Sequence, residues 1–282
     1  MSSDTINHMD DLSRVIRGQA EELSEIKRLL GELINSTSGV VHTLRHENRL
    51  LLTQLRVQAL HNNILEFWYE GEIIRLFVPD ADTDLIQRDI VMWKTFFEVE
   101  FLERVRKRYG LSGAAVLDAG ANIGNHTVFF SKACGAGSVI SFEPNPHVAD
   151  ILERNVRLNN LPSATVIKEG LSDHQGFIYF SSHSMANVGG TSFSHEGVGR
   201  GFKCRTIDSL NLPKLDFVKI DVEGMGGKVL AGGMDTLSQH RPIVMIELFP
   251  HEFEEAAVRF SDLGYSVAEQ LNSDNFIFEY KG

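Results

Sequence analysis

Two acidic residues end apolar runs in the middle of the chain, and a turn of small residues lies between them. Residues 116–127 read Val-Leu-Asp-Ala-Gly-Ala-Asn-Ile-Gly-Asn-His-Thr, and Glu143 ends the next apolar run, 138–142. An apolar run, a small-residue turn and a renewed apolar run are typical of a buried strand, a tight turn that can touch a ligand, and a helix start. Together they predict a nucleotide-like cofactor across two strands of an α/β sheet.

Asn122 indicates which cofactor this is, because it stands where a dinucleotide-binding turn has its second glycine. A side chain there crowds a pyrophosphate but can hydrogen-bond an amino acid moiety, which S-adenosylmethionine carries and NAD lacks. We expect Asp118 to meet the ammonium group of that moiety and Glu143 to bind the ribose hydroxyls. The simpler alternatives are that Asp118 caps the turn and Glu143 only ends a strand. The cofactor residues we expect are Asp118, Gly120, Asn122, Gly124, Glu143 and Leu171.

A later apolar run, 216–220, leads into further acids. The two-residue period of a strand puts Lys219, Asp221 and Glu223 on one side, and Glu247 ends the following run. Converging carboxylates can bind a substrate, act as a general base or hold a divalent metal. We expect a catalytic role for Asp221 and substrate binding by Glu223 and Glu247, and the need for a metal stays open. The alternative is that Asp221 caps a turn and Glu223 begins a helix.

Two histidines are further candidates for the catalytic base. His126 follows the small-residue turn, and His251 comes just after the apolar run that Glu247 ends. Histidine can take up a proton near neutral pH, which a hydroxyl nucleophile requires. Each could instead be an ordinary helix-start or surface residue.

The elements that must position these residues alternate between strand and helix from residue 111 onward, which predicts a doubly wound, mostly parallel α/β sheet. With a C-terminal antiparallel hairpin, it would be a seven-stranded sheet of the kind common in methyltransferases. The expected strands are 115–119, 138–143, 164–168, 215–221, 242–248, 265–270 and 275–280, and the expected helices are 127–133, 146–158 and 228–239.

Two further segments precede this domain. Over residues 1–62, apolar residues recur at alternating spacings of four and three from Leu12 to Leu51, which favours a coiled coil that makes a homo-oligomer. The alternative is an amphipathic helix or helical hairpin on the chain's own domain, with a break near 35–39. Residues 63–110 are expected to form a β-hairpin and a helical stretch whose aromatic stripe (Trp93, Phe96, Phe97, Phe101) packs in the core.

Composition excludes several classes of partner. A net charge of −11 argues against broad attraction to nucleic acid or to anionic membranes, and no apolar run approaches membrane-spanning length. The chain has 2 cysteines and no apolar N-terminal leader. We therefore expect a cytoplasmic protein with no membrane span and no nucleic-acid partner.

Four motifs resemble those of the FkbM-type methyltransferases: 118–127, Glu143-Pro144-Asn145, 206–210 and 219–232. The resemblance covers residues 67–282. It implies S-adenosylmethionine contacts from the first two motifs, an active-site position for Asp221 and a substrate-side segment at 187–192, from which we take Asn187 and Ser192 as substrate-binding. Family members usually carry an acid two residues after the glycine of Asp-Val-Glu-Gly, whereas this chain has Gly226 there.

The family is known for methylating hydroxyls of sugars and secondary metabolites, so the first hypothesis is an O-methyltransferase acting on such a small-molecule or glycan acceptor. A second is methylation of an amine nitrogen, which the sequence does not distinguish from the first. A third is a coiled-coil scaffold protein with a degenerate cofactor site, which Gly226 alone favours.

Overall fold

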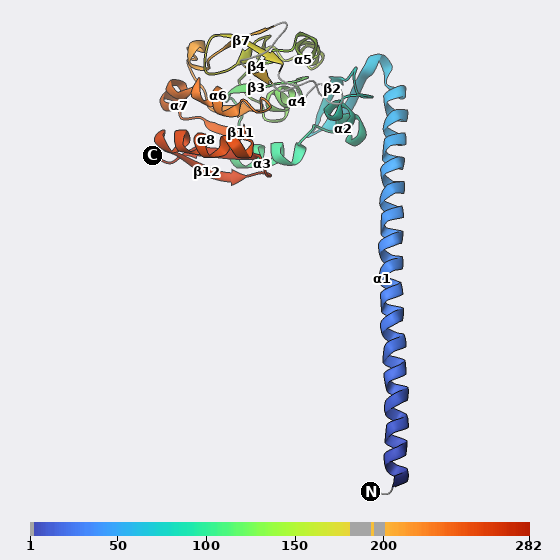
Figure 1. Cartoon of the computed structure of the whole chain (residues 1–282). Coiled ribbons are helices and arrows are strands. Elements are labelled where there is room, and N and C mark those ends of the chain that lie inside the picture. The colour runs from blue at the N-terminus through green and yellow to red at the C-terminus, as the bar shows by residue number, and fades with distance from the viewer. Residues whose placement is uncertain (1–2, 181–192, 195–200) are drawn as a thin grey trace. The chain divides into compact units, whose positions relative to one another are not determined.

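A computed structural model describes residues 3–180, 193–194 and 201–282 (Figure 1). The chain divides into two compact units, Met1–Leu55 and Arg56–Gly282. The first belongs to helix α1 (Ser3–Ala59), which is continuous through 35–39. The Thr37 and Thr43 hydroxyls donate to helix carbonyls four residues earlier, so these side chains are accommodated within the helix. The expected division at residues 62 and 110 stays a prediction.

Helix α1 carries an apolar stripe on its surface. Its members at the expected three- and four-residue spacings are each between 51% and 60% exposed: Ile26, Leu30, Leu33, Val40, Leu44 and Leu51. Elsewhere on the helix, Arg28 forms ion pairs with Glu25 and Glu32, one turn away on either side. An apolar stripe at three- and four-residue spacings is typical of a coiled-coil helix. The coiled coil itself stays a prediction.

The second unit is built on a seven-stranded sheet in the order β12-β13-β11-β10-β3-β4-β5. Its strands are β3 (Ala115–Ala119), β4 (Ser138–Phe142), β5 (Ala164–Ile167), β10 (Phe217–Ile220), β11 (Ile243–Glu247), β12 (Tyr265–Gln270) and β13 (Asn275–Tyr280). The five strands from β5 to β11 pair in parallel, and β13 is antiparallel to both of its neighbours. The expected seven strands and C-terminal hairpin are confirmed.

Alternation along the strands builds two cores, one on each face of the sheet. Val116 and Phe217 belong to the first core, whereas Leu117 and Val218 belong to the second. The first core includes side chains of α5 (Pro146–Leu158), and the second includes side chains of α6 (Gly226–Ala231), α7 (Met234–His240) and α8 (Pro250–Asp262). The sheet is therefore doubly wound, as predicted (Figure 1).

The segment before the sheet packs into the first core. Strands β1 (Ile64–Tyr69) and β2 (Glu72–Phe77) form the expected hairpin after a short 3₁₀ turn, η1 (His61–Asn63), and helices α2 (Leu85–Trp93) and α3 (Val99–Tyr109) follow. Phe96, in the loop between α2 and α3, is buried and packs edge-on against the rings of Phe67, Tyr69 and Phe129. Trp93 is 57% exposed, so the prediction that the whole aromatic stripe is core was wrong for this residue.

One predicted helix is divided into two helices at a pair of glycines. The expected helix 228–239 is two helices, α6 and α7, which are separated by Gly232 and Gly233. A Cβ on Gly232 would lie 2.1 Å from the Ser172 carbonyl oxygen, so this position requires glycine. The chain turns there, and the Asp208 carboxylate accepts from the backbone N–H groups of Asp235 and Thr236 at the start of α7. Asp208 begins a short 3₁₀ turn, η3 (Asp208–Leu210).

Other elements differ from the prediction or were not predicted. The helix expected at 127–133 begins earlier as α4 (Asn125–Val128) and continues as a π-helical turn, η2 (Phe129–Ala133). Helix α8 and a small sheet with the order β6-β9-β7-β8 were not predicted. The small sheet contains β6 (Gly170–Leu171), β7 (Gly176–Phe180), β8 (Phe193–Ser194) and β9 (Phe202–Arg205). Among the described residues, the helices lack a stretch long and apolar enough to cross a bilayer.

Candidate active site

The turn after β3 is pressed against the end of β10. Gly120 has a φ of +73°, and a Cβ on it would lie 1.7 Å from the carbonyl oxygen of Asp221. Glycine is required there by both the backbone conformation and the close approach. On the other side, the backbone N–H groups of Gly120 and Ala121 donate to the Phe142 carbonyl oxygen at 3.0 and 2.9 Å. The turn thus lies between the two strands whose ends carry acids.

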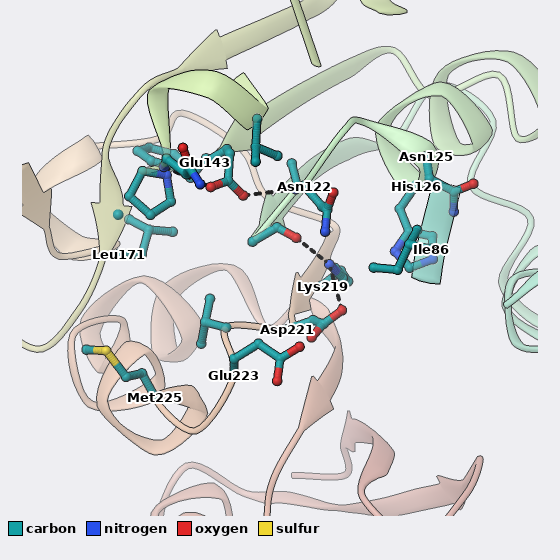
Figure 2. Close-up of a pocket in the computed structure, with 18 of the residues that line it drawn as sticks. Ile86, Asn122, Asn125, His126, Glu143, Leu171, Lys219, Asp221, Glu223 and Met225 are labelled. Atoms are coloured by element: carbon teal, nitrogen blue, oxygen red, sulfur yellow. Dashed lines mark hydrogen bonds and ion pairs between the residues drawn. The ribbon is translucent and has the colours of Figure 1, made fainter. Parts of the chain in front are cut away.

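Glu143, directly after β4, holds two loops together. One carboxylate oxygen accepts from the Asn122 N–H at 3.1 Å, and the other accepts from the Asn145 N–H at 2.9 Å (Figure 2). Burial raises the pKa of Glu143 to about 7, although these two donors act against the shift. Each carboxylate oxygen has a second lone pair, so Glu143 can still accept from a ligand's hydroxyl groups.

Lys219 is a buried cation that the site-residue prediction missed. Its ammonium group donates to the Gly120 carbonyl oxygen at 2.8 Å and lies 3.2 Å from a carboxylate oxygen of Asp221 (Figure 2). It also lies 3.5 Å from the Asp118 carboxylate. Burial by itself would lower the pKa of Lys219, but Asp221 and Asp118 outweigh burial and raise it. A lysine inside the apolar strand 217–220 was the signal in the sequence.

Asp118 and Gly124 lie beneath the turn and have structural partners. The Asp118 carboxylate is fully buried, accepts from the Thr127 hydroxyl at 2.7 Å and has Lys219 as its neighbouring cation. A contact between Asp118 and a ligand's ammonium group stays a prediction. A Cβ on Gly124 would lie 2.5 Å from Leu152, so this glycine lets α5 approach the turn.

A cavity of about 890 Å³, its open mouth included, joins these elements. Apolar side chains line it, among them Leu171 near Glu143 and Met225 near Glu223, and Asn122 lines it at the turn (Figure 2). Asn122 has a φ of +50°, and its side-chain oxygen accepts from the Ile123 N–H at 2.6 Å. In Figure 2, Glu143 and Leu171 lie on one side of Lys219 and Asp221, and His126 and Ile86 lie on the other. The cavity therefore has one end at Glu143 and Leu171 and a second end at Asp221 and His126.

Carboxylates gather at the second end. Asp221, Glu223 and Glu247 each offer an oxygen within 4.8 Å of the others, and Glu98 offers one within 4.8 Å of Asp221. Burial, followed by repulsion from Asp221, raises the pKa values of Glu98 and Glu223 to about 7. The sequence missed Glu98 because it belongs to the loop before α3, far along the chain from the other acids. This end of the cavity can bind a cation or accept a proton.

The two candidate histidines have different surroundings. His126 lines the cavity, and burial, assisted by Lys219, lowers its pKa to about 4, so the ring is neutral at pH 7. His251 is exposed at the start of α8 and does not line the cavity. The structure thus brings His126, but not His251, to the predicted site.

Three sequence predictions concern the remaining positions. Asn187 and Ser192 lie outside the described residues. A Cβ on Gly226 would lie 2.4 Å from the Glu247 carbonyl oxygen. An acid at position 226 would therefore require the end of β11 to move, and glycine fits this packing.

The acidic cluster predicts a pH-dependent stability. Burial, with repulsion from Asp221 and Glu223, raises the pKa of Glu247 to about 9, whereas an unfolded glutamate titrates near ~4.3. Protonated Glu247 therefore favours the folded state. This contribution to the free energy of unfolding is fully present below the pKa of the unfolded state and is lost as the pH rises toward the pKa of the folded state. After discounting for partial exposure, we expect Glu247→Gln to raise the Tm by about 2–4 °C at pH 8, roughly 1 kcal/mol, with no change near pH 4.

Scanning calorimetry at both pH values measures this effect. Glu255→Gln, which removes an exposed carboxylate on α8, is the matched control and should show no such pH dependence. An equal gain for Glu247→Gln at both pH values would contradict the titration argument.

Comparisons with known proteins agree with this arrangement. A family profile described as "Methyltransferase FkbM domain" matches residues 118–267. The hexuronic acid methyltransferase AglP of Haloferax volcanii is 33% identical over 186 residues, which cover 64% of this chain and 62% of that protein. Methyltransferase 1 of Beauveria bassiana is 22% identical over 205 residues, 61% of this chain and 82% of that protein. A crystal structure of methyltransferase FkbM from Methylobacillus flagellatus has 16% identity and a TM-score of 0.48 over 68% of this chain and 52% of that chain.

The extent of these matches bears on what they show. The chain spans about three fifths of the length of the Haloferax protein. The family profile runs from Asp118 in β3 to Val267 in β12 and covers more than half of the 282 residues. It includes the turn, Glu143, Lys219 and the acids after β10. The chain therefore belongs to the FkbM methyltransferase family.

Proposed function

We propose that this chain binds S-adenosylmethionine and methylates a hydroxyl group of a sugar or a small metabolite. The observation that carries the proposal is the two-ended cavity. Glu143 and apolar side chains line one end, and Asp221, Glu223 and His126 line the other. The first end suits a nucleoside, and the second suits a polar acceptor.

The residues at the first end fit S-adenosylmethionine. Both oxygens of Glu143 retain a lone pair for the ribose hydroxyls, and Leu171, Ile178 and Met225 offer apolar surface to the base. Among the described residues that line the cavity, Lys219 is the one lysine or arginine, and it is engaged by Asp221. A pyrophosphate would meet little positive charge here, so a donor without phosphates fits better than NAD.

S-adenosylmethionine supplies an electrophilic methyl group when bound. Its leaving thioether is neutral, so the protein needs no general acid. What the chain must do is hold the acceptor hydroxyl in line and accept its proton. Asp221 and His126 line the cavity where this would happen, and Glu223 adds a carboxyl whose pKa of about 7 suits a proton acceptor at neutral pH.

The similarity to hexuronic acid methyltransferase supports a sugar as the acceptor. The gathered carboxylates favour the second candidate, an amine acceptor, because they would attract its ammonium form. Transfer of isotope-labelled methyl groups to matched sugar and amine acceptors, followed by mass spectrometry of the product, distinguishes the two.

Calorimetric titration tests the donor. We expect S-adenosylmethionine to bind the full chain in a 1:1 ratio and NAD not to bind under the same conditions. Binding of NAD without binding of S-adenosylmethionine would reject the proposal.

We further propose that the chain is a cytoplasmic homo-oligomer, assembled through the apolar stripe of α1. Deleting residues 12–51 should lower the molar mass measured by light scattering to that of a monomer, because the coiled-coil contact is lost. Binding of S-adenosylmethionine should be unaffected, since every cavity residue lies in the second unit. An unchanged oligomer mass would refute this role for α1.

A further inference from the structure

Three potential metal ligands from three different elements converge at the polar end of the cavity. Glu98 precedes α3, His126 lies in α4, and Asp221 follows β10. Each offers one ligand atom, and the three atoms lie within 4.8 Å of one another. Convergence of side chains so distant in the chain is characteristic of a built site.

His126 gives an independent indication that a ligand belongs there. Its side chain is 7% exposed, and its Nε2 atom has no hydrogen-bond partner among the described residues. Glu98 is its nearest carboxylate at 3.6 Å, which is too long for a hydrogen bond. A buried nitrogen left without a partner is unfavourable for the folded state. In the neutral imidazole one ring nitrogen carries a lone pair, and the unpartnered Nε2 can present it to a cation.

The local charge points the same way. Glu98, Asp221, Glu223 and Glu247 surround this end of the cavity, and Lys219 is the cation that interacts with them. A divalent cation would offset the excess negative charge.

We propose that Glu98, His126 and Asp221 bind one first-row divalent transition-metal ion. Imidazole suits transition metals better than it suits magnesium or calcium, and two carboxylates add the charge that a divalent ion requires. Bonds of ~2.1 Å place two ligand atoms about 3.0–3.4 Å apart in octahedral or tetrahedral geometry, so the side chains need to close by up to about 1.4–1.8 Å around a bound ion. The all-carboxylate cluster of Asp221, Glu223 and Glu247 lacks this imidazole.

The metal site lies away from Glu143, at the end where the acceptor would bind (Figure 2). A bound ion there would polarise an oxygen of the acceptor and favour loss of its proton. Binding of the ion does not depend on methyl transfer or on the methyl donor. The metal proposal and the proposed function can therefore fail separately.

Titration of the EDTA-treated full chain with CoCl₂, followed by calorimetry and visible absorption, tests the site. We expect one ion per chain and an absorption band from the bound cobalt. Glu98→Gln and His126→Gln should each weaken cobalt binding at least tenfold, since each removes a ligand. His251→Gln, which changes an exposed histidine outside the cavity, should bind cobalt like the parent.

Thermal unfolding of each variant confirms that it is folded, and if His126→Gln does not fold, Glu98→Gln alone decides. Unchanged affinity in Glu98→Gln, or no stoichiometric binding by the parent, would overturn the proposal. Loss of binding in Glu247→Gln but not in Glu98→Gln would place the ion at the other cluster and would also overturn it. Titration of the metal-free chain with S-adenosylmethionine tests the proposed donor independently.

Discussion

Gly120→Ala is expected to destabilise the second unit by about 3 kcal/mol or more, because two costs add. An alanine in the left-handed conformation costs roughly 1–2 kcal/mol. Its Cβ would also lie 1.7 Å from the Asp221 carbonyl oxygen, a backbone atom that cannot rotate away, and overpacking of this kind costs about 1–3 kcal/mol or more. A loss of this size lowers the Tm of a domain of 150–250 residues by roughly 6–12 °C.

Gly113→Ala is the matched control. Gly113 has the same φ of +73° as Gly120, but nothing lies within 4 Å of its Cβ position. It should therefore show the conformational cost alone, about 1–2 kcal/mol. The difference between the two variants, measured by urea denaturation, isolates the contact between the turn and β10. Equal losses of stability would show that the turn can move away from Asp221.

Glu143→Ala is expected to weaken binding of S-adenosylmethionine by about 10–150-fold, the equivalent of 1.5–3 kcal/mol for hydrogen bonds to a charged group. The substitution removes the predicted ribose contact, and it also leaves the Asn122 and Asn145 N–H groups without their acceptor. Calorimetric titration of the parent and the variant measures the change.

Asp150→Ala is the control for Glu143→Ala, because it removes an exposed carboxylate from the neighbouring helix α5 and should leave affinity unchanged. Equal affinity in the parent and in Glu143→Ala would mean that Glu143 makes no ribose contact. That result would favour the scaffold hypothesis over the enzyme.

The sequence predicted that the turn and Glu143 lie together because these signals are local. The turn 116–127 and Glu143 lie within a single strand-turn-helix-strand unit, so spacing alone fixes their relation. The strands were predictable because each is a short apolar run and strand and helix patterns alternate along the chain.

The acceptor end was less predictable because it is made by packing between distant segments. Glu98 lies in the loop between α2 and α3 and has a φ of +57°. No local sequence pattern indicates that this loop brings Glu98 to the site. The two histidines have similar places in the sequence, because His251 follows a strand end and His126 follows the turn. Of the two, only His126 is buried. The division between α6 and α7 was also missed. Glycine is required at position 232 by the close approach of Ser172, which is distant in the sequence, so the local pattern does not indicate it.

Lys219 has a consequence for how the two ends of the cavity behave together. One ammonium group contacts the Gly120 carbonyl at the donor turn and the Asp221 carboxylate at the acceptor end. Any ligand that alters the field at one end therefore changes proton affinity at the other, and thermodynamic reciprocity makes this influence equal in both directions. A ligand bound at the Gly120 turn and a ligand bound beside Asp221 would thus be coupled through a single shared charge.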